Sequence, residues 1–498
     1  MTASDKTLTA DKPRLTPKPG TWLGIPPFPE AVKTELQLSQ QRKNLSHATH
    51  VIREKRVLRA SEVENWEELR TAAEQIKDRV GRHLDTYLVQ AEEAMTAAGV
   101  TVHWARDGEE ANRIVSDIAK AKQIEEIVKI KSMVTQETDL NEHLEAEGIA
   151  AWETDLAELI VQLGHDLPSH ILVPAIHRNR TEVRDIFTEE MGRYGAPAPE
   201  GLSNEPTELT NAARAHLREK FLRAKMAVSG GNFIVAETGT LVIVESEGNG
   251  RMCLTLPETL VSVVGIEKIV PTLDDLEVFL KLLPRSSTGE RMNPYTSMWT
   301  GVRPGDGPQD LHVVLLDNGR SDVLADPVGR AALRCIRCSA CLNICPVYER
   351  AGGHAYGSPY PGPIGAILNP QLRGLDSKVD QALPFASTLC GACNEVCPVK
   401  IPFTDILVHL RNKVVEHKTA KRPTIEQGLM KSTTWAMSSG SHLEKVHWGS
   451  RMAGRVFRER WLGPMPMPLA SRWLQARDAE PLPSETFRAW WRTHREGK

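Results

Sequence analysis

The apolar and polar positions of the first 320 residues follow two different spacings. Between about residues 31 and 98, apolar side chains such as Ile76, Val80 and Leu84 recur every three or four positions, which predicts helices. From residue 99 onward, short apolar runs typical of strands alternate with segments of helical spacing. The predicted strands are 99–104, 126–134, 149–153, 171–174, 261–264 and 311–316, with a further pair about a glycine turn at 233–244, and the predicted helices between them include 108–121, 139–148 and 157–163.

This alternation indicates an α/β domain with a largely parallel sheet, which we place at residues 31–320. Residues 1–30 are rich in Pro, Lys and Thr and are predicted to form an extended arm. Turn-forming residues at 317–322 mark the end of the α/β domain. Residues 321–410 are predicted to form a small, mostly helical domain, and residues 411–498 a helical C-terminal region.

The composition is that of a globular protein, with 498 residues, 41% hydrophobic residues and a net charge of −3. This charge gives no reason to expect nucleic-acid binding. The sequence has no run of eighteen apolar residues, so no transmembrane helix is predicted. The N-terminus is polar and lacks an apolar targeting core, so we expect a cytoplasmic protein.

Charge and tryptophan are concentrated in the C-terminal region. Residues 411–498 hold 17 Lys and Arg against 8 Asp and Glu, and six of the eleven tryptophans: Trp435, Trp448, Trp461, Trp473, Trp490 and Trp491. One interpretation is a surface that docks on an acidic partner or on membrane headgroups at the inner face of the membrane. The other is a helical cap on the preceding domain, and the two are compatible.

Seven of the eight cysteines fall in two short runs. The first run, 335–346, has the sequence CIRCSACLNICP and matches the bacterial iron–sulfur template Cys-x2-Cys-x2-Cys-x3-Cys-Pro at every position. The second run, 390–398, is CGACNEVCP and lacks the first cysteine of that template, where Ser387 stands. Zinc is the rival for Cys-x2-Cys pairs, but zinc sites need neither the third cysteine nor the Cys-Pro endings. Iron–sulfur clusters are therefore favoured.

In two-cluster ferredoxins the fourth cysteine of each run binds the cluster of the other run. This rule assigns Cys335, Cys338, Cys341 and Cys397 to one cluster, and Cys345, Cys390 and Cys393 to the other. The second cluster could be a [4Fe–4S] cluster with Ser387, water or a partner's group on one iron, a [4Fe–4S] cluster whose open iron binds substrate, or a [3Fe–4S] cluster. Serine is a poorer iron ligand than thiolate, so we favour an open or adventitious fourth position.

The other candidate residues carry weaker signals. Glu237 and Glu247 lie at glycine-rich strand ends and could act as acid, base or nucleophile, although solvent-facing turns explain them better. The isolated Cys253 is predicted to be a core residue, and His165, His170 and His177 are predicted to have structural roles. The N–H of His354 is expected to bond cluster sulfur.

Long stretches of the chain resemble the lactate utilization protein B family. They include 131–137 (KSMVTQE), 153–156 (ETDL), 168–177 (PSHILVPAIH), 236–241 (AETGTL), 265–272 (GIEKIVPT), 315–321 (LLDNGRS), the first cysteine run, 352–356 (GGHAY) and 362–365 (GPIG). The resemblance implies an α/β domain similar to sugar-phosphate isomerases and CoA transferases, followed by an α-helical ferredoxin domain. It also implies two [4Fe–4S] clusters on the same seven cysteines, so the missing eighth ligand is a family pattern. Ser339, where many relatives are expected to have glycine, is not a ligand.

The resemblance implies the iron–sulfur component of a three-protein L-lactate oxidation system. We expect a non-catalytic subunit that relays electrons from a lactate-oxidising partner toward an acceptor such as quinone, because no flavin or nicotinamide fingerprint is visible. Two alternatives stay open. One is a subunit serving another 2-hydroxy acid such as glycolate, and the other is a CoA- or acyl-binding enzyme that uses Glu237 and Glu247 and keeps its clusters as structural elements.

Overall fold

The computed structural model describes residues 26–421, 423–456 and 485–495, in two units that divide between Val414 and Val415. Residues 1–25 of the predicted arm, and Trp461 and Trp473, lie outside the described residues. The end of the predicted arm is helical, because α1 (Phe28–Glu35) begins there. None of the helices in the described ranges could span a membrane.

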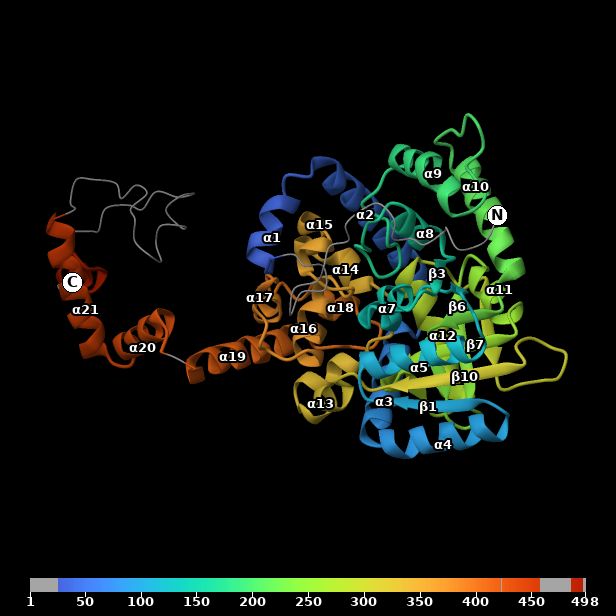
Figure 1. The fold of residues 1–498 in the computed structure, drawn as a ribbon. Helices are drawn as coiled ribbons and strands as arrows, with labels where there is room; N and C mark the ends of the chain where they lie inside the picture. The colour runs from blue at the N-terminus through green and yellow to red at the C-terminus, as the bar shows by residue number, and fades with distance from the viewer. Residues whose placement is uncertain (1–25, 422, 457–484, 496–498) are drawn as a thin grey trace. The chain divides into compact units, whose positions relative to one another are not determined.

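A six-stranded parallel sheet organises the α/β part of the first unit (Figure 1). Its strand order is β1-β10-β7-β4-β2-β3, and every neighbouring pair is parallel. The strands are β1 (Thr101–Ala105), β2 (Glu126–Lys129), β3 (Ala150–Glu153), β4 (Met226–Ser229), β7 (Thr259–Gly265) and β10 (Asp310–Leu316). The predicted mixed α/β class with a largely parallel sheet is therefore confirmed.

A second, mixed sheet lies beside the first, with the strand order β8-β5-β6-β9. Its strands are β5 (Phe233–Val235), β6 (Thr240–Glu245), β8 (Ile269–Val270) and β9 (Tyr295–Trp299). The pair predicted at 233–244 is confirmed as the antiparallel strands β5 and β6, but it belongs to this sheet and not to the parallel one. The side chains of β10 explain the layering, because Val313 and Leu315 face a core shared with the second sheet, whereas Val314 and Leu316 face the core of the opposite side.

Helices cover both faces of the parallel sheet. The core that contains Val314 also contains α5, whereas the core that contains Val313 contains α4 and α11. The helices of the α/β part are α4 (Leu84–Ala97), α5 (Gly108–Ala121), α6 (Met133–Glu137), α7 (Leu140–Ala146), α8 (Leu156–Leu163), α9 (Arg180–Tyr194), α10 (Pro206–Arg223), α11 (Asn249–Thr255) and α12 (Leu273–Ser287), with the 3-10 turn η2 (Ile266–Lys268). Asp107 caps α5 by accepting the Glu110 N–H at 2.9 Å.

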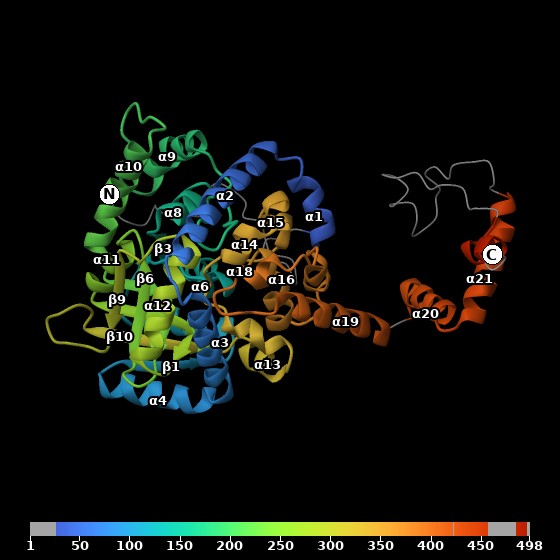
Figure 2. The ribbon, with the colours of Figure 1, turned by 180° about the vertical axis from the view of Figure 1, so that it is seen from behind.

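The cysteine-bearing part is mostly helical, as predicted. Its helices are α13 (Arg320–Ala325), α14 (Ala340–Ile344), α15 (Pro346–Ala351), α16 (Gly362–Leu372), α17 (Lys378–Ala382), α18 (Ala392–Val396) and α19 (Phe403–Lys421), with the 3-10 turns η3 (Gly329–Arg334), η4 (His354–Tyr356) and η5 (Leu383–Phe385). The N-terminal helices α2 (Ser39–Ser61) and α3 (Trp66–Arg82) pack on this part, since α2 contacts α14 and α15, and α3 contacts η3 (Figure 2). One hydrophobic core joins them, so the cysteine-bearing helices share their interior with the N-terminal helices.

The second unit, residues 415–498, is helical where it is described, which confirms the predicted helical C-terminal region. Beyond the last residues of α19, its helices are α20 (Ile425–Met437), α21 (Gly440–Val456) and α23 (Phe487–Arg495). Helices α20 and α21 contact each other, and Arg492 of α23 lies 3.6 Å from Glu444 of α21.

Two strand predictions are wrong. The strand predicted at 126–134 ends at Lys129, because Ser132 caps α6 by accepting the Thr135 N–H at 3.4 Å. The strand predicted at 171–174 is a turn, in which the Ser169 N–H bonds the Pro174 carbonyl at 3.0 Å. In that turn His170 Nδ1 accepts the N–H groups of Leu172 and Val173, both at 3.1 Å, so these groups are not available to a sheet.

Candidate iron–sulfur sites

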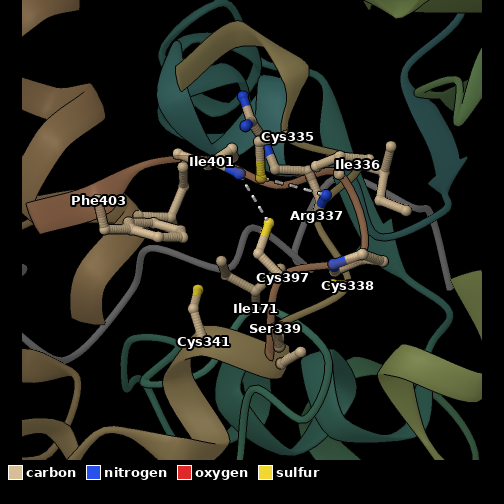
Figure 3. Close-up of a pocket in the computed structure, with 14 residues that line it drawn as sticks. Ile171, Cys335, Ile336, Arg337, Cys338, Ser339, Cys341, Cys397, Ile401 and Phe403 are labelled. Carbon is tan, nitrogen blue, oxygen red and sulfur yellow. Dashed lines mark hydrogen bonds between the residues drawn. The ribbon is translucent and has the colours of Figure 1, made fainter. Parts of the chain in front are cut away.

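Four cysteines line one small cavity (Figure 3). Cys335 and Cys338 reach it from the segment between η3 and α14, Cys341 reaches it from α14, and Cys397 reaches it from the end of α18. The rest of the lining is mainly apolar and includes Ile171, Ile336, Ile364, Val399, Ile401 and Phe403. The cavity therefore presents a set of thiols enclosed by side chains that exclude water.

Cys345, Cys390 and Cys393 form a second group. Burial, together with the charges of Cys345 and Cys390, raises the pKa of Cys393 to about 12. Burial likewise raises the pKa of Cys345, to which Cys390 also contributes. Cys390 is exposed, so this group lies nearer the surface than the first. Helix α14, which carries Cys341, contacts α18, which carries Cys393, so the two groups lie next to each other.

The backbone is arranged to donate to the sulfur atoms. The N–H groups of Arg337, Tyr348 and Ile401 point at sulfur, with N–S distances of 3.4 Å to Cys335, 3.5 Å to Cys345 and 3.4 Å to Cys397. Such donors favour the thiolate form and stabilise negative charge on a cluster.

Several buried polar atoms around the cysteines have no hydrogen-bond partner within the described residues. They are Arg337 Nε and Nη1, Ser339 Oγ, Asn343 Nδ2 and Tyr356 OH. Each of them can donate a hydrogen bond, and buried donors are ordinarily satisfied. Sulfide and thiolate acceptors would satisfy them, so the residues present fit iron–sulfur clusters in both the ligand set and the surrounding donors.

Cationic side chains surround the first group of cysteines. Five cations interact electrostatically with at least one of these cysteines: Arg56, Arg70, Arg337, Lys77 and Lys268. Burial, with a contribution from the charge of Arg337, lowers the pKa of Lys77 to about 8 and that of Lys268 to about 7. The charges that raise the pKa values of Cys345 and Cys393 are negative: the thiolates of the same group act on both cysteines, and Glu349 acts on Cys345. The two sites thus differ in their charge environment.

A buried ion network connects the first site to the α/β part. Arg320 forms two contacts of 2.9 Å with Glu137 and one of 2.6 Å with Glu267, and Arg337 Nη2 bonds the other oxygen of Glu267 at 3.2 Å. Burial opposes the ionised form of Glu267, but Arg320 and Arg337 outweigh it and lower its pKa to about 2. Sequence reasoning did not single out these four residues as a network, although Glu137, Glu267 and Arg320 lie in the quoted stretches and Arg337 lies between two cysteines.

Glu237 and Glu247 do not join the cysteines and do not form an acid–base pair with each other within the described structure. Glu237 Oε1 accepts the Leu273 N–H at 2.7 Å at the start of α12. Glu247 Oε2 accepts the Leu156 N–H at 3.1 Å at the start of α8. Both carboxylates therefore stabilise helix N-termini.

The remaining predicted residues have mainly structural surroundings. Cys253 is fully buried with Sγ 3.4 Å from Thr154 Oγ1, and burial raises its pKa to about 12, which confirms it as a core residue. His170 Nε2 lies 3.1 Å from Asn343 Oδ1, and burial lowers its pKa to about 3. His354 Nε2 bonds the Leu167 carbonyl at 2.8 Å and the ring packs on His177, so this nitrogen is not available for the bond to cluster sulfur predicted for His354.

Two protein families match this chain, and their matches fall in the same order as the α/β part and the cysteine-bearing part of the structure. Residues 88–316 match the LUD domain family, and residues 331–401 match the 4Fe-4S dicluster domain family. A solved structure of a DUF162 family protein from Deinococcus radiodurans covers 47% of this chain and 98% of its own, with 16% identity and a TM-score of 0.24.

Curated relatives match almost end to end. Lactate utilization protein B of Bacillus cereus strain B4264 is 40% identical over 480 residues, which cover 94% of this chain and 98% of the relative. The same identity and coverage hold for lactate utilization protein B of Bacillus cytotoxicus and lactate utilization protein B 2 of Bacillus mycoides. The chain therefore belongs to the lactate utilization protein B family.

Proposed function

We propose that this chain is the iron–sulfur electron-transfer subunit of a system that oxidises L-lactate to pyruvate. The observation that carries the proposal is the cavity lined by four cysteines, with a second group of three beside it. The 4Fe-4S dicluster match supports iron–sulfur binding, and the relatives' names support a role in lactate utilization.

In this proposal, Cys335, Cys338, Cys341 and Cys397 hold one [4Fe–4S] cluster, and Cys345, Cys390 and Cys393 hold the other. Bound clusters supply one-electron transfer. The chain's own residues set the conditions for it. Ile171, Ile401 and Phe403 keep water from the first site, and the N–H groups of Arg337, Tyr348 and Ile401 stabilise the sulfur atoms. The cations around the first site favour its reduced, more negative state.

We assign the oxidation of lactate itself to a partner subunit. The two glutamates considered for chemistry, Glu237 and Glu247, are bonded to the starts of α12 and α8 and are not gathered at one site. The exposed Cys390 gives the second site the shorter path to a redox partner at the surface.

We further propose that the basic, tryptophan-rich second unit attaches the protein peripherally to the membrane, where a quinone-type acceptor resides.

Lactate-dependent reduction of the reconstituted chain tests the proposal. The full chain and its partner subunits are mixed anaerobically with L-lactate, and bleaching of the cluster absorbance is followed. We expect bleaching with the natural chain, its loss or strong reduction in Cys397→Ala and Cys393→Ala, and no change in Cys253→Ala, which removes the eighth, buried cysteine. Full bleaching in both ligand variants would contradict the proposed relay. Bleaching by glycolate but not by L-lactate would assign another 2-hydroxy acid.

A further inference from the structure

The two cysteine runs adopt the same backbone course. In the first, Cys338 lies between two residues in the left-handed region, Arg337 and Ser339, each with φ of 61°. In the second, Cys390 lies between Leu389 with φ of 57° and Gly391 with φ of 82°. Left-handed conformations are rare outside glycine, so two such pairs at matching positions indicate a structural repeat.

The repeat continues through the following helix. Helices α14 and α18 have five residues each and begin with Ala-Cys after a left-handed residue. Each ends at a cysteine of nearly the same conformation, with φ −80° and ψ 118° at Cys345 and φ −69° and ψ 120° at Cys397. Proline follows both cysteines. The two helices pack against each other, so the runs form a pair of equivalent halves.

Ser387 occupies in the second half the position of Cys335 in the first. The Arg337 N–H bonds Cys335 Sγ, two residues earlier, at 3.4 Å. The Leu389 N–H bonds Ser387 Oγ, also two residues earlier, at 3.2 Å. Both Cys335 and Ser387 are half-buried. The serine oxygen therefore repeats the local bond that the ligand sulfur makes in the complete half.

The loop that carries Ser387 is fixed from outside. Arg411 of α19 donates to the Pro384 carbonyl at 2.9 Å and to the Ser387 carbonyl at 3.0 Å. Its guanidinium also lies 5.3 Å from the centre of the Phe385 ring. Three contacts from one side chain hold this segment in place, as a ligand position requires.

We propose that Ser387 Oγ is the fourth protein ligand of the second cluster. This inference rests on the proposed iron–sulfur function and departs from the open position favoured by sequence alone. Ligation replaces a water on the fourth iron by the serine oxygen, and the hydroxyl proton passes to solvent at this half-buried site. No electron is transferred in this step. Oxygen is a harder donor than thiolate, so the second cluster has one iron unlike the other three.

Three variants of the full chain test this assignment: Ser387→Ala, Ser387→Cys and, as the matched control, Thr388→Ala, which removes the hydroxyl of the exposed neighbour. Each is reconstituted anaerobically, and iron content, Mössbauer spectra and EPR spectra of the oxidised form are recorded. We expect about eight irons in the natural chain, in Ser387→Cys and in Thr388→Ala. Ser387→Ala should fall to about seven and show the EPR signal of an oxidised three-iron cluster. The distinct iron should be present in the natural chain and absent in Ser387→Cys.

A Ser387→Ala chain with about eight irons and the spectra of the natural chain would overturn serine ligation while leaving the two-cluster proposal intact. A three-iron cluster already in the natural chain would overturn it as well. A natural chain that binds about four irons would overturn both proposals, which separates the failure of this inference from that of the function.

Discussion

Arg337 shows how a single residue shapes the first cysteine site. It lies between Cys335 and Cys338, its guanidinium lies 4.7 Å from the Tyr360 ring centre, and it bonds Glu267, 70 positions away in the sequence. Burial opposes its charge, but Tyr360, Cys335 and Glu267 outweigh this and raise its pKa, so Arg337 stays ionised beside the thiolates. The sequence shows the arginine within the motif, but not its partners, because chain folding brings them together.

Removing this charge should change a reduction potential. We expect Arg337→Met to lower the potential of one of the two clusters by on the order of tens of millivolts, because a buried cation favours the more negative, reduced state. A potentiometric EPR titration measures both clusters. Arg223→Met, which removes an arginine paired with Glu126 in the α/β part, serves as the control and should leave both potentials unchanged. Unchanged potentials in Arg337→Met would show that this charge does not act on a cluster.

At the scale of elements, sequence periodicity predicts the helices and strands that are determined by local sequence. It misses the features that are determined by contacts between distant segments. The spacing at 108–121 predicts α5 to the residue, and 311–316 matches β10 closely. The apolar run 171–174 is a turn because its N–H groups bond His170, and the division of strands into two sheets follows from pairings that no local pattern contains. The assignment of the cysteines to two groups follows from spacing alone, whereas four of the five cations around the first group come from distant segments: Arg56, Arg70, Lys77 and Lys268.

The contact between the two parts of the first unit depends on a glycine. A Cβ on Gly353, just before η4, would lie 1.8 Å from the Ser169 carbonyl oxygen of the α/β part. We expect Gly353→Ala to separate these segments and to lower the thermal unfolding midpoint by several degrees, since a backbone clash destabilises by a few kcal/mol. Differential scanning calorimetry on the full chain measures this change.

Gly428→Ala is the matched control for that substitution. Gly428 lies in α20 and a Cβ there would meet nothing within 4 Å, so alanine should leave the midpoint unchanged or raise it slightly. Equal midpoints for Gly353→Ala and the natural chain would mean that the loop of Gly353 does not hold the two parts together.

At the scale of the whole molecule, the second unit differs from the first in surface chemistry. In α23, Phe487, Trp490 and Trp491 share one helical face and are 69%, 42% and 38% exposed. Arg488, Arg492 and Arg495 interleave with them, and the Arg495 guanidinium lies 4.8 Å from the centre of the Trp491 ring. Aromatic and arginine side chains on one short amphipathic helix are typical of binding at an anionic lipid surface.

Vesicle binding tests this surface. We expect the full chain to sediment with vesicles that contain phosphatidylglycerol and much less with phosphatidylcholine alone, and binding should weaken as salt rises. The double variant Trp490→Ala and Trp491→Ala should lose most of this binding. Trp104→Ala, which removes an exposed tryptophan of β1, is the control and should bind as the natural chain does. Binding that is equal on both lipids, or unaffected by the double variant, would contradict an anionic-lipid surface on α23.

The central claim, that one chain carries two redox-active clusters, is tested most directly by anaerobic reconstitution of the full chain, iron and sulfide analysis, and a potentiometric EPR titration of the same sample. Two clusters predict about eight irons per chain and two separate one-electron reductions. Fewer than about six irons per chain, or a single reduction, would contradict it.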